Sequence, residues 1–226
     1  MTNNFKAKIK IRPELSAQGI RKRQNPMLKP AIETALSLNH FASKNPLIVD
    51  YGCGQLRNVD LFLDFSQRII LIDTPDQLNT PHDFFGKRQL IRDFIPTHWP
   101  NANLQIMPSP TFENSMISAS IIAVVNVFDV VQPNIISIMT AAIKKNLDLN
   151  GILIVIVPRN DSWTLRLCTD KNIFDRGHYF YHPRGYTYYR NWFGDSLRRW
   201  LCKNGFSILK DLSCYRYVCL VLGHAK

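Results

Sequence analysis

The segment Leu47-Ile48-Val49-Asp50-Tyr51-Gly52-Cys53-Gly54 (LIVDYGCG, residues 47–54) decides the fold of this chain of 226 residues. Its apolar part predicts a strand over residues 47–52, and its two glycines predict a tight turn directly after that strand. Residues 56–65 have the spacing of a helix. A glycine turn between a strand and a helix lets a ligand approach the backbone, where free amide groups at the helix start meet its negative end.

A second strand, RIILID (residues 68–73), ends on an acid. Asp73 lies 19 residues beyond Gly54, the position from which an acid accepts hydrogen bonds from ribose hydroxyls. The two features together indicate an adenosine site. A dinucleotide fingerprint requires a third glycine where this chain has Arg57, and residues 55–58 lack the lysine of a P-loop. The pattern therefore disfavours NAD and excludes a P-loop ATP site.

Strands and helices continue to alternate along the chain, which predicts an α/β sandwich. Further strands are predicted over residues 103–107, 117–127 and 152–157, with a hairpin of 206–213 and 215–223, and helices over 30–42, 84–94, 133–146 and 187–203. Residues 5–12 alternate apolar and basic side chains and suit an edge strand or an extended arm. The buried helix faces are expected at Ile32, Ala35, Leu36 and Leu38 or Asn39, at Ile135, Ile138, Met139 and Ala142, and at Tyr189, Phe193, Leu197 and Leu201, with Thr187 as an N-cap.

The glycine loop resembles the first motif of class I S-adenosylmethionine-dependent methyltransferases. In that family an acid, a spacer and GxG precede the first helix, as do Asp50, Tyr51, Gly52, Cys53 and Gly54 here, followed by Arg57-Asn58. Residues 123–131, 147–158 and 197–206 resemble the family's fourth strand, fifth strand and last helix. The resemblance implies a Rossmann-like three-layer α/β sandwich, with a seven-stranded, mostly parallel sheet and an antiparallel C-terminal hairpin strand. One departure is Leu56, where many members have a third glycine.

The same resemblance implies the cofactor S-adenosylmethionine and a set of residues that bind it. Gly52 and Gly54 would face the methionine moiety, Asp50 would order its ammonium group, and Asp73 would hold the ribose. The remaining members of the set are Tyr51, Cys53, Arg57, Thr74 beside the adenine, and Asn126 in the methionine pocket. Charge alone suggests that Arg21 or Arg23 neutralises the methionine carboxylate.

A sulfonium is an activated methyl donor, so the protein mainly aligns the nucleophile and needs a base only if the acceptor must lose a proton. Candidate catalytic residues are Asp129 just past the fourth strand, and His178, Tyr181 and His182 after the fifth. Residues 126–129 lack the Pro-Pro motif of base-amine methylation, which disfavours an adenine-N6 enzyme. No Pro-Cys pair exists, which disfavours a cytosine-C5 enzyme.

We expect a basic arm with a helix over residues 1–45 and a methyltransferase domain over 46–226, with an aromatic lid at 159–190. The formal net charge is +11, and residues 1–30 hold eight basic residues against Glu14. The arm could bind RNA or DNA through Lys6, Lys8, Lys10, Arg12, Arg21, Lys22 and Arg23. Arginines among the lid's aromatic rings suit base stacking, RNA more than DNA, although a lid over an aromatic small molecule would look the same.

Three alternatives therefore stay open: a nucleic-acid methyltransferase, a methyltransferase of a small metabolite or natural product, and a non-catalytic nucleic-acid-binding subunit. A degenerate domain that keeps the loop only for folding is the remaining interpretation. Five cysteines without a CxxC pair, and no secretory signal, favour reduced thiols and a cytoplasmic location. We expect no metal, and no membrane span because the apolar runs fall short of roughly 20 residues.

Overall fold

The computed structural model describes residues 24–38, 45–159, 173–174, 177–182, 185–190, 192 and 195–225. Its helices are α2 (Leu28–Leu38), α3 (Val59–Leu63), α4 (Pro75–Asn79), α5 (Ile91–His98), α6 (Ser109–Asn114), α7 (Pro133–Asn146) and α9 (Ser196–Lys203). Its strands are β1 (Ile48–Tyr51), β2 (Arg68–Asp73), β3 (His82–Phe84), β4 (Lys87–Gln89), β5 (Asn103–Pro108), β6 (Ala119–Val125), β7 (Leu147–Pro158), β8 (Ile173–Phe174), β9 (Gly177–His182), β10 (Gly185–Arg190), β11 (Phe206–Asp211) and β12 (Tyr217–His224). Most of the predicted strands and helices are therefore present.

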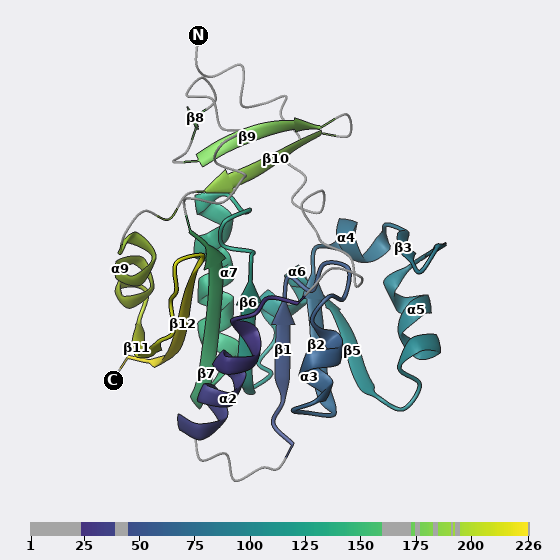
Figure 1. Cartoon of the computed structure of the whole chain (residues 1–226), viewed down its shortest axis with the longest axis horizontal. Coiled ribbons are helices and arrows are strands. Elements are labelled where there is room, and N and C mark those ends of the chain that lie inside the picture. Colours follow the sequence, from purple (N-terminus) through teal and green to yellow (C-terminus); the bar gives the residue numbers. More distant parts are fainter. Residues whose placement is uncertain are drawn as a thin grey trace.

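The main sheet has seven strands in the order β11-β12-β7-β6-β1-β2-β5 (Figure 1). Strands β5, β2, β1, β6 and β7 run parallel, while β12 runs antiparallel to both of its neighbours. The predicted Rossmann-like sheet with an antiparallel C-terminal hairpin strand is confirmed. The chain leaves β1 toward β2 on one side and returns to β6 on the other. Ligands bind at such a reversal, beyond the carboxyl ends of the strands.

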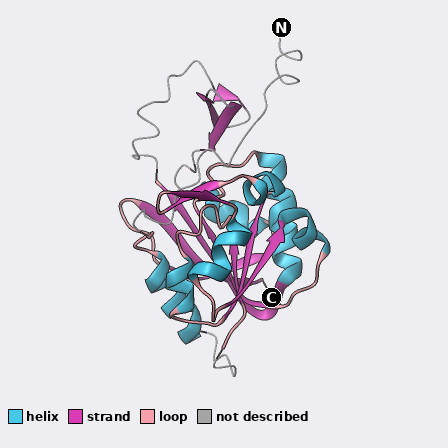
Figure 2. Ribbon diagram, turned by 90° about the vertical axis from the view of Figure 1, so that its right-hand side faces the viewer, coloured by secondary structure: helices cyan, strands magenta, loops and turns pink. Residues whose placement is uncertain are grey.

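Helices cover both faces of the sheet and make the three layers (Figure 2). Alternate strand residues enter two separate apolar clusters: Ile48 and Ile121 face α2, α3 and α5, while Val49 and Ile122 face α6, α7 and α9. Because both faces are buried, the central strands are apolar without interruption. This accounts for the long run that predicted a central strand at residues 117–127.

Helix α2 belongs to the same core as the sheet, because it packs on β7 and β12. Its buried residues are Leu28, Ala31, Ile32 and Ala35. The predicted face was right at Ile32 and Ala35 but wrong at Leu38, which is exposed. The basic residues of the arm, from Lys6 to Arg23, lie outside the described residues.

Helix α7 begins and ends as predicted but is rotated. Ile135 and Ile138, expected inside, are exposed, and Ile136, Thr140, Ile143 and Asn146 are buried beside the correctly predicted Met139 and Ala142. Two polar side chains lie inside because they find partners. The Thr140 hydroxyl donates to the Ile136 carbonyl, and Asn146 donates to the Phe112 carbonyl.

The helix predicted over residues 84–94 is wrong at its beginning. Strands β3 and β4 form a hairpin there, with Phe85 (φ 56°) and Gly86 (φ 89°) both left-handed. The carboxylate of Asp83 accepts a hydrogen bond from the Gly86 amide at 2.8 Å and closes the turn. Glycine carries this conformation without strain, so the turn interrupts the helical spacing and α5 begins only at Ile91.

The helix predicted from Thr187 is also wrong over its first half, because residues 185–190 form β10, which pairs antiparallel with β9. The ring of Tyr188 is fully buried over Gly177, where any side chain would collide with it. Thr187 is thus a strand residue and not an N-cap. The helix itself, α9, keeps the predicted buried pair Leu197 and Leu201.

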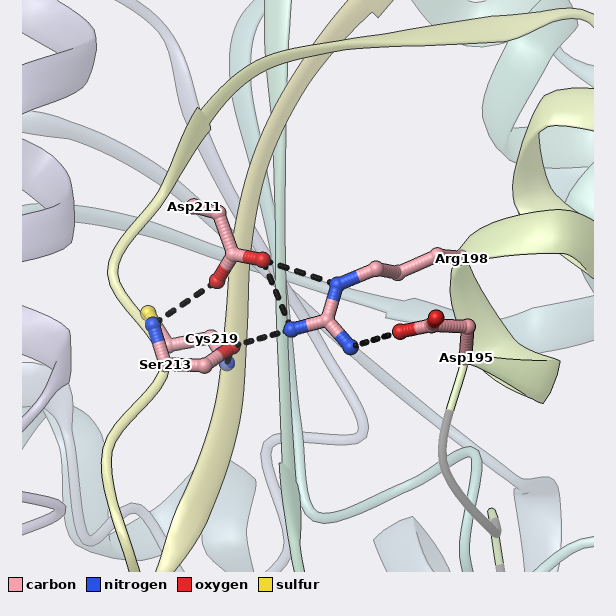
Figure 3. Close-up of polar contacts among 5 residues, drawn as sticks. All are labelled: Asp195, Arg198, Asp211, Ser213 and Cys219. Atoms are coloured by element: carbon pink, nitrogen blue, oxygen red, sulfur yellow. Dashed lines mark hydrogen bonds and ion pairs between the residues drawn. The ribbon is translucent and has the colours of Figure 1, made fainter.

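Arg198 fastens α9 to the β11–β12 hairpin (Figure 3). Its guanidinium donates to the carboxylates of Asp211 at 2.8 Å and Asp195 at 2.9 Å, and to the hydroxyl of Ser213 at 3.1 Å. The Ser213 hydroxyl also accepts from the backbone amide of Cys219. A planar guanidinium with several donors suits such a junction better than an ammonium group.

Candidate functional site

The glycine loop lies at the carboxyl end of β1, against the end of β2. The amides of Gly52 and Cys53 both donate to the Ile72 carbonyl, at 2.8 and 3.0 Å. Gly52 has φ 83°, and a Cβ atom there would collide with Cγ2 of Val127 in the loop after β6. Glycine is required at position 52 for two reasons, conformation and space, and the loops after β1 and β6 are in close contact.

Asp73 holds the other side of the glycine turn. Its carboxylate accepts hydrogen bonds from the Gly54 amide at 2.7 Å and from the Thr74 amide at 2.8 Å. The carboxylate is partly exposed, and each of its oxygens can accept more than one hydrogen bond. The predicted ribose acid therefore lies beside the predicted loop.

Leu56 lies between the glycine turn and α3, and its backbone is left-handed, with φ 65°. Its side chain is fully buried. Its amide donates to the Cys53 carbonyl at 2.9 Å and completes a tight turn. A residue with a Cβ atom is strained in this conformation by about 1 to 2 kcal/mol. Glycine, which lacks a Cβ atom, would adopt this conformation without that strain.

Asp50, in β1, is a buried carboxylate with no hydrogen-bond donor among the described residues. It is 1% exposed, and neither of its oxygens accepts a hydrogen bond from any described residue. Burial, and to a smaller extent the Asp73 carboxylate, raise the pKa of Asp50 from 3.8 to about 7, while the Arg57 guanidinium opposes this shift. A buried acceptor without a partner costs about 1 to 3 kcal/mol, which a cationic ligand would recover.

The side chains of Tyr51 and Cys53 lie in the core rather than toward a ligand. Tyr51 packs edge-on against Phe112, with ring centroids 5.4 Å apart, and Cys53 is 4% exposed. Burial raises the pKa of both groups, so both stay neutral. These two predicted residues can contribute to a cofactor site only through their backbone. Burial lowers the pKa of Arg57, while Asp50 opposes that change.

Asn126 and Asp129 lie in the turn that follows β6. Asn126 is left-handed (φ 56°), its amide donates to the Ile156 carbonyl, and its buried side-chain oxygen Oδ1 has no partner among the described residues. Asp129 is 5% exposed, and its Oδ1 atom likewise meets no donor in the described part of the chain. Burial raises the pKa of Asp129 to about 7, against the effect of a backbone hydrogen bond.

The predicted lid is, in its described part, the three-stranded sheet β10-β9-β8. It contacts the turn after β6: the Arg190 amide donates to the Asp129 carbonyl at 2.6 Å, and the indole of Trp192 donates to the Phe128 carbonyl at 3.0 Å. Figure 1 shows the hairpin beyond the ends of β6 and β7. His178, Tyr181 and His182 lie on β9, opposite Tyr189, Tyr186 and Gly185. The orientations of their side chains are not described, so their catalytic roles stay predictions.

Gln77 is a candidate that the sequence analysis missed. It is fully buried, and both polar atoms of its side chain lack partners in the residues described. Thr74-Pro75-Asp76-Gln77 has the form of a capping box, and the Thr74 hydroxyl accepts from the Gln77 amide at 3.2 Å. In a complete capping box the Thr74 amide would also donate to the Gln77 side chain. Here it donates to the Asp73 carboxylate instead. The capping-box pattern could have indicated α4 and this inward-facing amide just past the ribose acid.

Within the residues described, no cluster of histidine, cysteine or acidic side chains could hold a metal ion. Cys53, Cys202, Cys214 and Cys219 are free thiols, and Cys168 lies outside the described residues. No helix in the described segments combines the length and apolar character needed to cross a membrane.

No family model and no curated protein sequence matches this chain. Solved structures of methyltransferases do match it. A S-adenosylmethionine-dependent methyltransferase from Methanosarcina mazei has 12% identity and a TM-score of 0.62, with 91% of this chain and 100% of that chain covered. The 1,6-didemethyltoxoflavin-N1-methyltransferase of Burkholderia thailandensis, with bound 1,6-didemethyltoxoflavin and S-adenosylhomocysteine, has 13% identity and a TM-score of 0.57, covering 88% and 80%.

A third match is the magnesium protoporphyrin IX methyltransferase of Synechocystis PCC 6803 with bound S-adenosylhomocysteine. It has 14% identity and a TM-score of 0.55, with 88% of this chain and 83% of that chain covered. This chain therefore has the Rossmann-like fold of class I S-adenosylmethionine-dependent methyltransferases.

Proposed function

We propose that this protein is a S-adenosylmethionine-dependent methyltransferase. The single observation that carries the proposal is the arrangement at the ends of β1 and β2: a buried Asp50 to which no described residue donates, a glycine turn without room for a Cβ atom at Gly52, and Asp73 bound to that turn. An ammonium group would satisfy Asp50, and ribose hydroxyls would donate to Asp73. The residues present thus fit this cofactor, which supplies an activated methyl group when bound.

Each residue has a defined task in this function. Asp50 holds the ammonium group, and the backbone of residues 52–54 lines the methionine moiety. Asp73 fixes the ribose, while Thr74 and Gln77 lie next along the chain, where the adenine would bind. The protein aligns the acceptor with the methyl group and excludes water, which lowers the entropic part of the barrier.

We propose a small molecule as the acceptor. The rings of Tyr188 and Trp192 are buried, Tyr188 over Gly177, and the Arg190 guanidinium lies 3.8 Å from the centre of the Trp192 ring, so these two rings offer no free stacking surface. Two proteins of the same fold are named for small acceptors, 1,6-didemethyltoxoflavin and magnesium protoporphyrin IX. RNA is the second candidate, and DNA the third; they rest on the basic residues from Lys6 to Arg23.

Calorimetric titration tests the cofactor site. We expect S-adenosylmethionine to bind the wild type, and Asp73→Ala to lose at least about tenfold in affinity, because hydrogen bonds to a carboxylate contribute about 1.5 to 3 kcal/mol each. Asp64→Ala is the matched control, since Asp64 is an exposed acid at the end of α3. No binding by the wild type, or equal binding by wild type and Asp73→Ala, would reject this site.

Transfer of labelled methyl groups into separated fractions of a cell extract identifies the acceptor class. Label in the low-molecular-weight fraction supports the small-molecule proposal. Label in RNA or DNA would replace it with the nucleic-acid proposal. Binding of S-adenosylmethionine without transfer into any fraction, together with nucleic-acid affinity that falls steeply with salt, would identify a non-catalytic binding subunit.

A further inference from the structure

Two buried oxygen atoms in the turn after β6 accept no hydrogen bond from the described part of the chain. They are Oδ1 of Asn126 and Oδ1 of Asp129, three residues apart, and no described residue donates to either. Buried polar atoms without a partner are rare and costly, and each one calls for an explanation. Other unpartnered atoms of the molecule lie apart from this turn in the sequence, whereas these two share one short loop.

The position of the turn gives that explanation. Val127, between the two residues, packs against Gly52 of the proposed cofactor loop. On its other side the Asp129 carbonyl accepts from the Arg190 amide of β10. Burial first, and then the Asp129 carboxylate, raise the pKa of the Tyr189 phenol on the same strand. The turn that carries the two acceptors therefore lies between the proposed cofactor loop and the β9–β10 hairpin.

Resting on the methyltransferase function proposed above, we propose that Asp129 and Asn126 bind the methyl acceptor through a primary amino group, which is the atom that becomes methylated. The number of hydrogens favours nitrogen over oxygen. A hydroxyl has one hydrogen and can satisfy one acceptor, whereas a primary amine has at least two and can satisfy both. A carboxylate at one of the two positions strengthens the bond to an N–H donor.

The chemistry of the step balances with Asp129 as the base. The lone pair of the neutral amine forms the N–C bond to the methyl group as the S–C bond of the sulfonium breaks, leaving a thioether. The nitrogen is then a secondary ammonium, and one of its protons passes to the Asp129 carboxylate. The product is a neutral N-methylamine, and Asp129 returns its proton to water after release. A positioned base of this kind contributes about 10² to 10⁴ in rate.

The test identifies the atom that receives the label. Wild-type protein is incubated with S-adenosylmethionine, carrying a stable carbon isotope in its methyl group, and the low-molecular-weight fraction of a cell extract. Nuclear magnetic resonance of the labelled carbon then distinguishes N-methyl from O-, S- and C-methyl groups. We expect a secondary N-methylamine. Label on oxygen, sulfur or carbon, or on a nitrogen that was not a primary amine, would overturn the inference while leaving the methyltransferase function in place.

Failure of the underlying function gives a different result. If S-adenosylmethionine does not bind, or binds and is transferred into no fraction, the proposed function fails and this inference falls with it. Cofactor titration before the labelling experiment therefore separates the two failures.

Substitution of the carboxylate tests the role of Asp129. In Asp129→Asn the shape and one acceptor oxygen remain, but the base is lost. With the identified amine as substrate, we expect kcat to fall by about 10² or more, and the affinity of the S-adenosylhomocysteine-loaded protein for that amine to fall at least about tenfold. Cofactor affinity should stay near wild type, as in the exposed-acid control Asp64→Asn, and so should the melting temperature at pH 4, where Asp129 is protonated in the folded wild type. An Asp129→Asn protein with wild-type kcat and amine affinity would exclude Asp129 from the site.

Discussion

The carboxylate of Asp73 and the backbone amide of Gly54 are joined by a hydrogen bond of 2.7 Å across 19 residues of sequence. The acid that we propose binds the ribose thus also fixes the turn that we propose lines the methionine moiety. Asp73→Asn retains one acceptor oxygen, whereas Asp73→Ala retains none. We expect affinity for S-adenosylhomocysteine in the order wild type, Asn, Ala, measured by calorimetry; equal losses in both variants would mean that Asp73 acts only through its charge.

Gly52 and Gly86 form a matched pair of glycines, with φ of 83° and 89°. A Cβ atom at Gly52 collides with Val127, whereas a Cβ atom at Gly86 meets nothing within 4 Å. Both alanine substitutions should lower the free energy of unfolding by about 1 to 2 kcal/mol through backbone strain. We expect Gly52→Ala to lower it by about 1 to 3 kcal/mol more through overpacking. Urea denaturation measures the difference. Val127→Ala should restore part of the loss at position 52 and none at position 86.

Leu56 should reverse the usual order of alanine and glycine. Both Leu56→Ala and Leu56→Gly remove a fully buried side chain, at about 2 to 5 kcal/mol. At φ 65° alanine keeps the strain and glycine relieves it, so Leu56→Gly should be the more stable of the two by about 1 kcal/mol. In an ordinary helix alanine is the more stable residue. Equilibrium denaturation measures the stability of both variants. If Leu56→Ala were more stable than Leu56→Gly, the result would contradict a left-handed Leu56.

The buried Asp50 makes stability depend on pH. Its pKa is raised from 3.8 to about 7, so between about pH 4 and pH 7 the folded chain keeps a proton that the unfolded chain has lost. Stability from this group is therefore full below about pH 4 and declines as the pH rises to 7, by up to about 4 kcal/mol. Asp50→Asn should be more stable than the wild type at pH 8, with little difference at pH 4. The pKa of Asp129 is also raised to about 7. Asp129 therefore accounts for the dependence of stability on pH that remains in Asp50→Asn.

Binding of a cationic ligand at Asp50 should release a proton. A nearby ammonium group lowers the pKa of a carboxyl group, so a chain that is largely protonated at Asp50 at about pH 6 must ionise when S-adenosylmethionine binds. Calorimetry in buffers with different ionisation enthalpies counts the protons. We expect release by the wild type and almost none by Asp50→Asn. Equal release by both would assign the proton to another group.

How far the sequence determines the fold can be seen at particular elements. The strand over 68–73 was predicted with its observed ends, and the strands at β1, β6 and β7 were also found, because buried parallel strands are apolar without interruption. Asp73 was predicted beside the glycine loop because spacing alone places it there. The sequence failed where a tertiary contact outweighs local spacing: Tyr188 lies over Gly177, and Asn146 is buried because the Phe112 carbonyl accepts from it.

Gln77, whose side chain has no partner among the described residues, and the turn from Asn126 to Asp129 show a second limit. No pattern in the sequence reveals whether a polar side chain finds a donor, since that depends on elements distant along the chain. Asp129 was named from its place after a strand, but its isolation is a property of the folded molecule. The predicted roles of His178, Tyr181 and His182 stay predictions.

The packing of α2 on β7 and β12 has a consequence for synthesis. The Sγ atom of Cys219 lies 4.0 Å from the Met27 carbonyl, across 192 residues. A ribosome delivers the apolar face of α2, with Leu28 and Ile32, long before the strands that cover it. The helix must therefore wait, exposed to water or to a chaperone, until nearly the whole chain has emerged. A nascent chain that stalls before β12 would leave part of this apolar face uncovered.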